Sequence, residues 1–203
     1  SWAVYDLANT IFALGVGSLY FAEWLNDNRS GIPSFLLRND SPDLALAVTI
    51  DVAMVVVIVL GPWIGARSDH GNRRRYLLPM TLLCVVPTFF LAAGSVTASL
   101  ALYAVALVGF NLGGIVYDAM LPDVSTPTTI GRVSGIGIGV GYLGSFIAVA
   151  VGALLLDDHG HAGVFKVIAV LFLAFALPAF SLVRERPRRA PAGPPPAVAD
   201  SLR

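Results

Sequence analysis

The sequence predicts an all-α membrane protein with six transmembrane helices. Of its 203 residues, 56% are hydrophobic and only 13% are charged, and the mean hydropathy is +0.76. A soluble domain carries about 25% charged residues. The apolar residues also gather into six runs, each near the length of roughly 20 residues that a helix needs to cross a bilayer. The charged residues lie between these runs, as expected if the runs are immersed in lipid.

The six predicted spans are residues 3–21, 44–64, 76–93, 100–117, 133–156 and 164–183. Helices are expected because an open sheet would leave backbone groups without hydrogen-bond partners in lipid, and because the runs do not alternate apolar with polar residues. The uncharged segment 94–99 is expected to join the third and fourth spans as a tight hairpin. Residues 1–183 are thus predicted to form one six-helix transmembrane bundle.

The two ends of the chain differ from this bundle. Residues 184–203 are first basic and then rich in proline, which is typical of a solvated linker or tail with polyproline character. The chain starts at Ser1 and enters an apolar run almost at once. No basic region or small-residue cleavage site precedes that run, so a truncated start is expected rather than a signal peptide.

The basic residues predict the orientation in the membrane. If the spans alternate, most of the arginines fall on one side, among them Arg67, Arg73, Arg74, Arg75, Arg132, Arg184, Arg186, Arg188 and Arg189. Only Arg29, Arg38 and Lys166 fall on the other side. Because cytoplasmic loops carry an excess of Lys and Arg, the arginine-rich side is expected to be cytoplasmic. Both termini are then predicted to lie in the cytoplasm.

Several chemistries are disfavoured. The single cysteine, Cys84, excludes an internal disulfide and a thiolate metal cluster, and the three histidines show no metal-ligand spacing on one helix face, so no metal or cofactor is expected. A formal net charge of zero does not suggest a nucleic-acid partner. An intramembrane serine protease built on Ser134 would need a histidine within a span, and Asp118 with Asp123 is too sparse for a phosphoryl-transfer metal site. The sequence therefore does not predict an enzyme.

The loop between the second and third predicted spans carries the most specific local pattern. It reads Gly65-Ala-Arg-Ser-Asp69-His-Gly71-Asn-Arg73-Arg74-Arg75. Gly65 permits close backbone approach, Asp69 can accept hydrogen bonds from a helix amino terminus, and the arginines hold the loop at the cytoplasmic face. An ordinary cytoplasmic loop is the alternative. The spacing resembles the signature loop of the major facilitator superfamily, Gly-x-x-x-Asp-x-x-Gly-Arg-Arg, although the second glycine stands one position early.

Three further segments extend the resemblance. They read Tyr5-Asp6-Leu-Ala8-Asn9-Thr10, Tyr117-Asp118-Ala-Met-Leu121-Pro122, and Ser134-Gly135 followed by Gly141-Tyr142-Leu143-Gly144. They are similar to the patterns Tyr-Asp-x-Ala-Asn-Ser, Tyr-Asn-Ala-x-Leu-Pro and Ser-Gly followed by Gly-Tyr-x-Gly-Gly. These patterns occur in the branch of the superfamily that contains the autophagy-related vacuolar amino-acid effluxers and their bacterial relatives. Thr10, Asp118 and Ser145 depart from them.

The resemblance implies a secondary transporter that works by alternating access. Its fold has twelve helices in two halves, and each half is built from two three-helix inverted repeats. This chain would be the amino-terminal half in a bacterial cytoplasmic membrane, with the carboxy-terminal half missing. The first and fourth helices would line the cavity, and Asp69 with Arg73 would latch the cytoplasmic side against the other half. The implied substrate is a small solute such as an amino acid, and the proton is a candidate coupling ion.

Two other functions stay open at this point. The chain could be a six-helix membrane scaffold or receptor, or it could be a half-transporter that works as a dimer. Six further helices downstream in the reading frame would favour a complete transporter, whereas a natural stop after this segment would favour one of these alternatives.

Polar residues inside the predicted spans are the candidates for contact with substrate or protons, because an ionisable group in a bilayer is costly. Asp6 and Asn9 share one face of the first span, although Asp6 also suits a helix amino terminus. Asp51 lies near the middle of the second span, where removal from water favours the neutral form of a carboxyl group. A structural hydrogen bond between helices, or a misplaced span boundary, is the alternative for Asp51.

The fourth and fifth spans supply the remaining candidates. Asn111 and Tyr117 lie in the inner half of the fourth span, where a hydrogen bond between helices is as reasonable as ligand binding. Tyr142 belongs to the glycine-rich pattern of the fifth span and completes the set.

The fifth span is also rich in glycine, at Gly135, Gly137, Gly139, Gly141 and Gly144. Glycines four residues apart let helices approach closely and slide, so this stripe is expected to serve helix packing rather than ligand binding. Gly109 with Gly113, and Gly61 with Gly65, repeat the same spacing in other spans.

Overall fold

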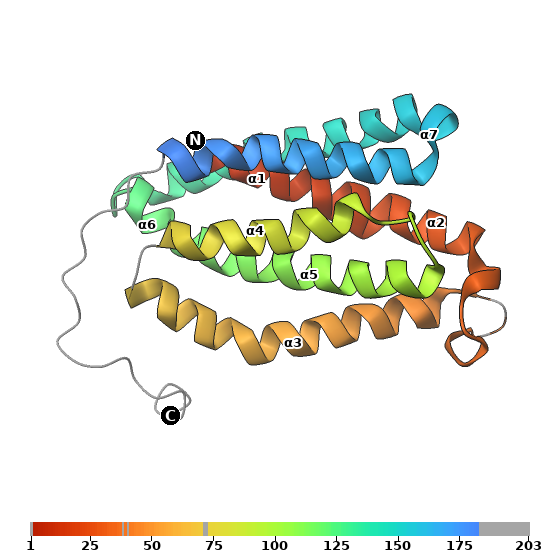
Figure 1. Ribbon diagram of the computed structural model, residues 1–203. Helices are drawn as coiled ribbons and strands as arrows, with labels where there is room; N and C mark the ends of the chain where they lie inside the picture. The colour runs from red at the N-terminus through yellow and green to blue at the C-terminus, as the bar shows by residue number, and fades with distance from the viewer. Residues whose placement is uncertain (1, 38, 40, 71–72, 183–203) are drawn as a thin grey trace.

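The helices of the protein lie side by side along one long axis (Figure 1). The computed structural model describes residues 2–37, 39, 41–70 and 73–182, without the side chains of residues 69, 70 and 182. Every regular element in these ranges is a helix, which confirms the all-α prediction. The proposed tail at 184–203 and the second glycine of the loop, Gly71, lie outside the described residues.

The first helical stretch changes its helix type midway. It consists of α1 (Trp2–Phe12), the π-helix η1 (Ala13–Tyr20) and α2 (Phe21–Asp27). A π-helical turn shifts the hydrogen-bond pattern and leaves carbonyl groups in need of other donors. The hydroxyl of Tyr103 donates to the carbonyl of Gly17 at 3.2 Å. Two short 3-10 turns, η2 (Arg29–Gly31) and η3 (Ser34–Leu36), follow before the next helix.

Three long helices come next. They are α3 (Asp43–His70), α4 (Arg73–Phe89) and α5 (Val96–Ala119). The connection between α4 and α5 covers residues 90–95, slightly earlier than the expected hairpin at 94–99. The side chain of Ser95 accepts a hydrogen bond from the amide of Ala98, and this cap begins α5 at Val96.

The last helix folds back on itself. After the single turn α6 (Leu121–Val124), α7 runs from Ile130 to Leu182. Gly160 interrupts it with non-helical angles, φ 61° and ψ −177°, which favour glycine. The two limbs of α7, residues 130–159 and 161–182, therefore run in opposite directions (Figure 1). They are called the first and second limbs below.

Four described stretches are long and apolar enough to cross a membrane: Trp2–Asp27, Asp43–Ser68, Val96–Ala119 and Ile130–Ser181. The last of these contains the reversal at Gly160 and so includes both limbs of α7. Helix α4 has 17 residues and begins with three arginines, which leaves it short of a full span. The fold is thus that of a helical membrane protein, and the number of six crossings stays a prediction.

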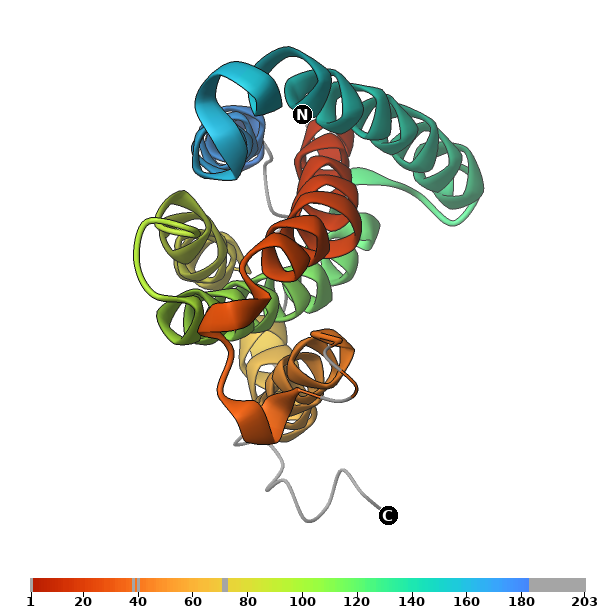
Figure 2. The same cartoon turned by 90° about the vertical axis from the view of Figure 1, so that its right-hand side faces the viewer.

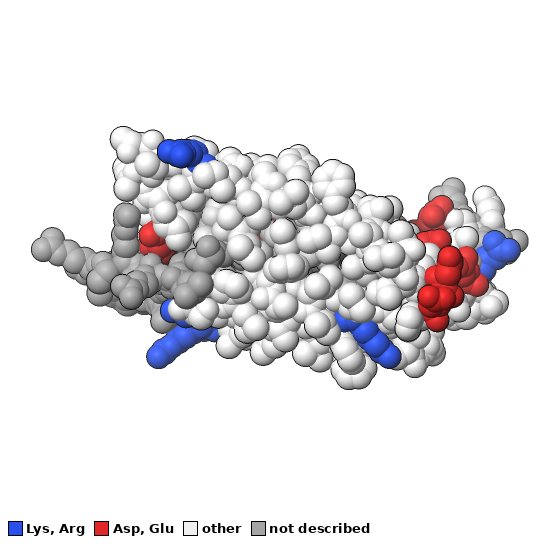
Figure 3. Space-filling view, turned by 90° about the horizontal axis from the view of Figure 1, so that it is seen from above, with Lys and Arg blue, Asp and Glu red and all other residues white. Residues whose placement is uncertain are grey.

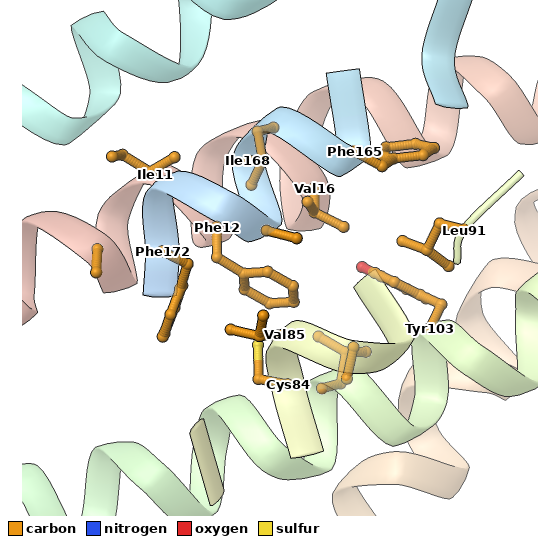
Figure 4. Packing of buried hydrophobic residues seen from close by; sticks show 14 of the residues in the cluster. Ile11, Phe12, Val16, Cys84, Val85, Leu91, Tyr103, Phe165, Ile168 and Phe172 are labelled. Carbon is orange, nitrogen blue, oxygen red and sulfur yellow. The ribbon is translucent and has the colours of Figure 1, made fainter. Parts of the chain in front are cut away.

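The helices pack around α1. Viewed end-on, α1 lies between the two limbs of α7 on one side and α5 on the other, with α3 at the far edge (Figure 2). The buried side chains of Phe12, Ile168 and Phe172 meet Cys84 and Val85 of α4 in the centre (Figure 4). In the apolar part of α3 only 17% of the residues are buried, compared with 50% in the first stretch. Helix α3 therefore turns most of its apolar surface outward.

The outer surface fits a lipid environment. Most charged side chains gather toward the two ends of the long axis, one basic group lies nearer the middle, and the rest of the surface in this view is uncharged (Figure 3). Large apolar side chains of α3 and α7 are also exposed: Ile58, Phe146 and Leu154 are more than two-thirds exposed, at 71%, 73% and 75%. In water this much exposed apolar surface would favour aggregation, whereas in a membrane lipid or other apolar helices can cover it.

Candidate functional site

An aromatic cluster joins the start of α1 to the last turns of α5. The ring of Tyr117 stacks on Trp2 with centroids 4.5 Å apart and on Tyr5 with centroids 5.0 Å apart. The indole nitrogen of Trp2 also donates to the carbonyl oxygen of Tyr117 at 3.4 Å. All three side chains are buried. The first residues of the chain are therefore held by specific contacts and not only by burial of apolar area.

A hydrogen bond connects this cluster to α4. The hydroxyl of Tyr5 and the hydroxyl of Thr81 are 2.8 Å apart, and Thr81 donates to the carbonyl of Leu77 at 2.9 Å. Because the proton of Thr81 is used in that second bond, Tyr5 donates to Thr81. Helices α1, α4 and α5 thus meet at one buried polar point.

Two buried polar atoms, one in α1 and one in α5, have no hydrogen-bond partner within the described part of the structure. They are the amide oxygen of Asn9 and the hydroxyl of Tyr117. Leaving a buried polar group unpaired costs about 1–3 kcal/mol. Such groups are unusual in folded proteins and call for a partner, such as a water molecule or a ligand. Asn9 and Tyr117 were both predicted as substrate contacts.

Asp6 lies where α1 crosses the first limb of α7. A Cβ atom placed on Gly141 would come within 2.5 Å of the Asp6 carboxylate and 3.1 Å of the Thr10 hydroxyl. The Asp6 side chain therefore rests directly on Gly141, and a larger residue there would push the carboxylate aside. Asp6 is half-buried, between solvent and the helix pair.

Two more glycines of the first limb lie in close contact with α1. A Cβ on Gly137 would lie 2.7 Å from the ring of Trp2, and one on Gly144 would lie 2.5 Å from the carbonyl oxygen of Leu7. Together with Gly141 they form one glycine face of α7. Gly135 and Gly139 have open space around them and lie outside this contact.

A second carboxylate stands near Asp6. Asp118, in the last turn of α5, and Asp6 both lie within electrostatic range of the Tyr117 hydroxyl. In the sequence, Asp118 stood out as a departure from an asparagine and, with Asp123, as a pair too sparse for a metal site, so its place beside Asp6 is information from the fold.

The arginine-rich loop is anchored to the end of α5. Arg73, the first residue of α4, donates to the carbonyl of Ala119 and pairs with the carboxylate of Asp123 at 3.3 Å. The side chains of Arg73 and Asp123 are each only 6% exposed. Asp123 lies in α6, directly after the Leu121-Pro122 pair of the predicted pattern. This buried ion pair was not foreseen from the sequence.

The other predicted loop residues lie nearby. Gly65 is in the last turns of α3, where an added Cβ would make an ordinary 3.8 Å contact with Ile115, and Arg74 follows Arg73 in the first turn of α4. Asp69 belongs to the last turn of α3, and its side chain lies outside the described residues.

Three predicted site residues lie apart from the aromatic cluster. Asp51 is exposed on α3, on the same face as Val55 and Ile58. Tyr142 is 67% exposed on the first limb of α7. Asn111 donates to the carbonyl of Leu107 at 2.8 Å, within its own helix. Their roles in substrate or proton binding stay predictions.

Two structural features at the helix contacts have only weak signals in the sequence. The π-helix η1 contains Gly15 and Gly17, whose spacing alone does not predict a change of helix type. A Cβ on Gly109 would come within 2.5 Å of the backbone nitrogen of Cys84, so α4 and α5 touch through their backbones. The repeated glycine spacing of α5 pointed to close packing but not to this partner.

No group of three or more His, Cys, Asp or Glu residues in the described ranges could hold a metal ion.

Comparison with known proteins places these features in a family. The family model described as Major Facilitator Superfamily matches residues 5–201. An uncharacterized MFS-type transporter, YxiO, of Bacillus subtilis (strain 168) is 28% identical over 172 residues, which cover 77% of this chain and 37% of that protein. An uncharacterized protein of Aquifex aeolicus (strain VF5) is 22% identical over 183 residues, covering 88% of this chain and 43% of that protein. The chain thus spans about two-fifths of the length of these relatives. No solved structure matches it.

Proposed function

The chain belongs to the major facilitator superfamily, and from this premise we propose that it is part of a secondary transporter that moves a small solute by alternating access. The proposal is supported by the apolar helical stretches and by the family match, which covers nearly all of the described residues. Six crossings would come from the first stretch, α3, α4, α5 and the two limbs of α7. They would form two three-helix inverted repeats, with both termini in the cytoplasm.

A polypeptide segment outside this chain would supply the other half of the transporter. The relatives are more than twice as long as the matched part, which supports a second half of similar size. The exposed apolar faces of α3 and of the first limb of α7 are the surfaces on which that half would pack. A half-transporter that works as a dimer is the second candidate, because a second copy of the chain could cover the same faces.

The observation that carries the proposal is the group of polar atoms at the junction of α1, α5 and the first limb of α7. It combines the carboxylates of Asp6 and Asp118 with the buried, unpartnered atoms of Asn9 and Tyr117. A solute with an ammonium group and further hydrogen-bonding atoms, such as an amino acid, would complement all four residues. We therefore place substrate binding here, with Asp6 as the principal contact.

Proton coupling is the second part of the proposal. Asp6 and Asp51 are its candidates. Asp6 is supported by its half-buried place against Gly141, because an ionisable group within a spanning stretch is costly and is usually functional. Asp51 lies on the outward face of α3, and it would enter an interface between the two halves if the missing half packs there.

The arginine-rich loop would control the cytoplasmic side. Arg73 is fixed to Asp123 and to the end of α5, so the start of α4 and the end of α5 would move as one body. Asp69 would then latch this body to a helix of the other half in one state of the transport cycle. Breaking that latch would open the cytoplasmic side.

Transport by the full-length protein in proteoliposomes tests the proposal. We expect uptake of at least one labelled amino acid to depend on an imposed proton gradient, and Asp6→Asn to abolish it. Asp157→Asn is the matched control, because Asp157 is exposed near the reversal of α7, away from the cluster. Gradient-dependent uptake that is unchanged in Asp6→Asn would remove this cluster from the mechanism. A tryptophan-fluorescence or calorimetric titration would show whether the variant still binds the solute.

A further inference from the structure

An apolar groove lies between α4 and the second limb of α7, on the outside of the helix bundle. It has a volume of about 290 Å³ and is lined by Val85, Val86, Phe89, Phe90, Ala169, Val170 and Leu173. Val85 and Ala169 are buried and form its floor. Val86, Phe90 and Val170 are each about half exposed, at 50%, 52% and 56%, and form its walls. None of the lining side chains can form a hydrogen bond or carry a charge.

A single cation stands at one end of this groove. The ammonium group of Lys166 lies 6.0 Å from the centre of the Phe89 ring, and Phe89 is a lining residue. Lys166 precedes Val170 by four residues, so it stands one helical turn beyond the groove on the same side of the limb. It is the only lysine of the chain. Its side chain is exposed, and no salt bridge joins it to a carboxylate of the described residues.

The position of Lys166 along the helix places it near a membrane surface. It follows the reversal at Gly160 by six residues, which is about 9 Å of helix. A lysine at this depth extends its charge to the headgroup level while its stem covers apolar surface. The groove runs from there toward the middle of α4 and of the second limb. A phospholipid has its headgroup at the membrane surface and its acyl chains below. A cation near the surface with an apolar groove below it matches these two parts.

We propose that this groove is a binding site for one anionic phospholipid. One acyl chain would lie along Val86, Phe90 and Val170, and the headgroup phosphate would pair with Lys166. The charge selects the occupant: an apolar groove alone takes any lipid chain, whereas an unpaired lysine at its mouth favours a lipid with net negative charge. The proposal concerns the face away from α3 and the first limb, so it does not depend on the proposed transport function.

Photo-crosslinking with lipid analogues tests the site directly. The full-length protein in mild detergent is mixed with phosphatidylglycerol or phosphatidylcholine that carries a diazirine in one acyl chain, and the labelled peptides are identified by mass spectrometry. In the wild-type protein we expect the segments 85–90 and 169–173 to be labelled about fivefold more by phosphatidylglycerol, the factor that one lysine near an anionic headgroup supplies. Equal labelling by the two lipids would overturn the proposal.

Variants separate the headgroup from the acyl chain. Lys166→Gln should reduce the preference to about one while weak labelling by both lipids continues. Lys166→Arg should keep the preference, and Arg29→Gln, which removes another exposed cation, should not change it. Val170→Trp should fill the groove and reduce labelling by both lipids. An unchanged preference in Lys166→Gln, or full labelling in Val170→Trp, would contradict the site.

Two further arms exclude other occupants. An excess of soluble glycerol 3-phosphate should not reduce the labelling, since a headgroup without chains gains nothing from the groove; a strong reduction would indicate a free-phosphate site instead. Native mass spectrometry of the same samples should show lipid adducts on a monomer. If the groove is shielded from both lipids in a dimer, a second copy of the chain covers it and the lipid proposal fails. Thermal unfolding of each variant checks that the fold is retained.

Discussion

Arg73 and Asp123 form a buried ion pair at 3.3 Å, although 50 residues separate them in the sequence. The pair fastens the first turn of α4 to the short helix α6, directly after α5. It makes the arginine-rich loop part of the helix packing and not merely a basic cytoplasmic segment. Removing the Asp123 carboxylate would take a counter-ion from a buried guanidinium, which is costly.

Asp123→Asn is therefore expected to destabilise the protein by about 3 kcal/mol, within the usual range for breaking a buried pair. Thermal unfolding in detergent, followed by tryptophan fluorescence, measures the change. Asp158→Asn is the control, because Asp158 is exposed at the end of the first limb and should leave stability unchanged. Equal stability of the two variants would show that the pair contributes little.

Gly141→Ala should push the Asp6 side chain out of its place. The new methyl group would stand 2.5 Å from the Asp6 carboxylate and 3.1 Å from the Thr10 hydroxyl, and because both are side-chain ends that can shift, the cost should be about 1 kcal/mol, the lower end for overpacked sites. Gly139→Ala is the matched control two residues away, where nothing lies within 4 Å. There the better helix propensity of alanine should stabilise the protein by up to about 1 kcal/mol. Opposite shifts in the unfolding temperature are expected, and a loss of transport only in Gly141→Ala.

Gly109→Ala should have a larger effect than Gly141→Ala. Its methyl group would meet the Cys84 backbone nitrogen at 2.5 Å and the Leu83 carbonyl carbon at 2.6 Å, and backbone atoms cannot rotate away. We expect α4 and α5 to separate, with a loss of about 3 kcal/mol or more, at the upper end for overpacked sites. Gly114→Ala on the same helix, with open space around it, should be tolerated. Expression level and monodispersity in gel filtration distinguish the two variants.

Tyr117→Phe and Tyr5→Phe separate stability from function. The Tyr5 hydroxyl is bonded to Thr81, so its removal should cost about 1 kcal/mol. The Tyr117 hydroxyl has no partner among the described residues, so its removal should leave stability unchanged or raise it by about 1 kcal/mol. If Tyr117 contacts the solute, transport by Tyr117→Phe should still fall severalfold through a higher KM. A stable variant with unaltered KM would argue against that contact.

Asp51→Asn tests the other carboxyl candidate for proton coupling. We expect solute movement to continue down its own gradient while the dependence on a proton gradient is lost, because a carboxamide cannot take up a proton at neutral pH. Counterflow and gradient-driven uptake in the same proteoliposomes measure the two activities separately. Unchanged dependence on the proton gradient would remove Asp51 from the mechanism. Asp43→Asn, at the start of the same helix, is the control.

Much of the architecture could be predicted because a lipid environment forces long apolar runs to form helices. Long apolar runs such as 44–64 and 100–117 have no stable alternative to a helix in lipid, whatever they pack against. The glycine face at Gly137, Gly141 and Gly144 was also visible in the sequence as close spacing. Spacing does not say which glycines are used: Gly135 and Gly139 belong to the same pattern and face open space. The choice depends on how α7 is rotated against α1.

The site was only partly predictable, because it too depends on how the helices are rotated against one another. Asp6, Asn9 and Tyr117 could be selected because polar groups are costly in an apolar run. Their meeting point depends on the crossing of α1, α5 and α7. Asp118 and Asp123, one beside Asp6 and the other paired with Arg73, have no sequence feature that distinguishes these two roles. Short-range electrostatics depend on distances of a few ångströms, which no local pattern contains.

By itself, the sequence determined that the protein is helical, that it belongs in a membrane, and which family it joins. These properties follow from the total apolar area and from motifs that are local in the chain. The tertiary structure alone decided that Asp6 rests on Gly141, that Arg73 is neutralised by Asp123, and that Lys166 stands at the mouth of an apolar groove. Each of these depends on the relative rotation of two helices, which is set by packing along their whole length and not by any one segment.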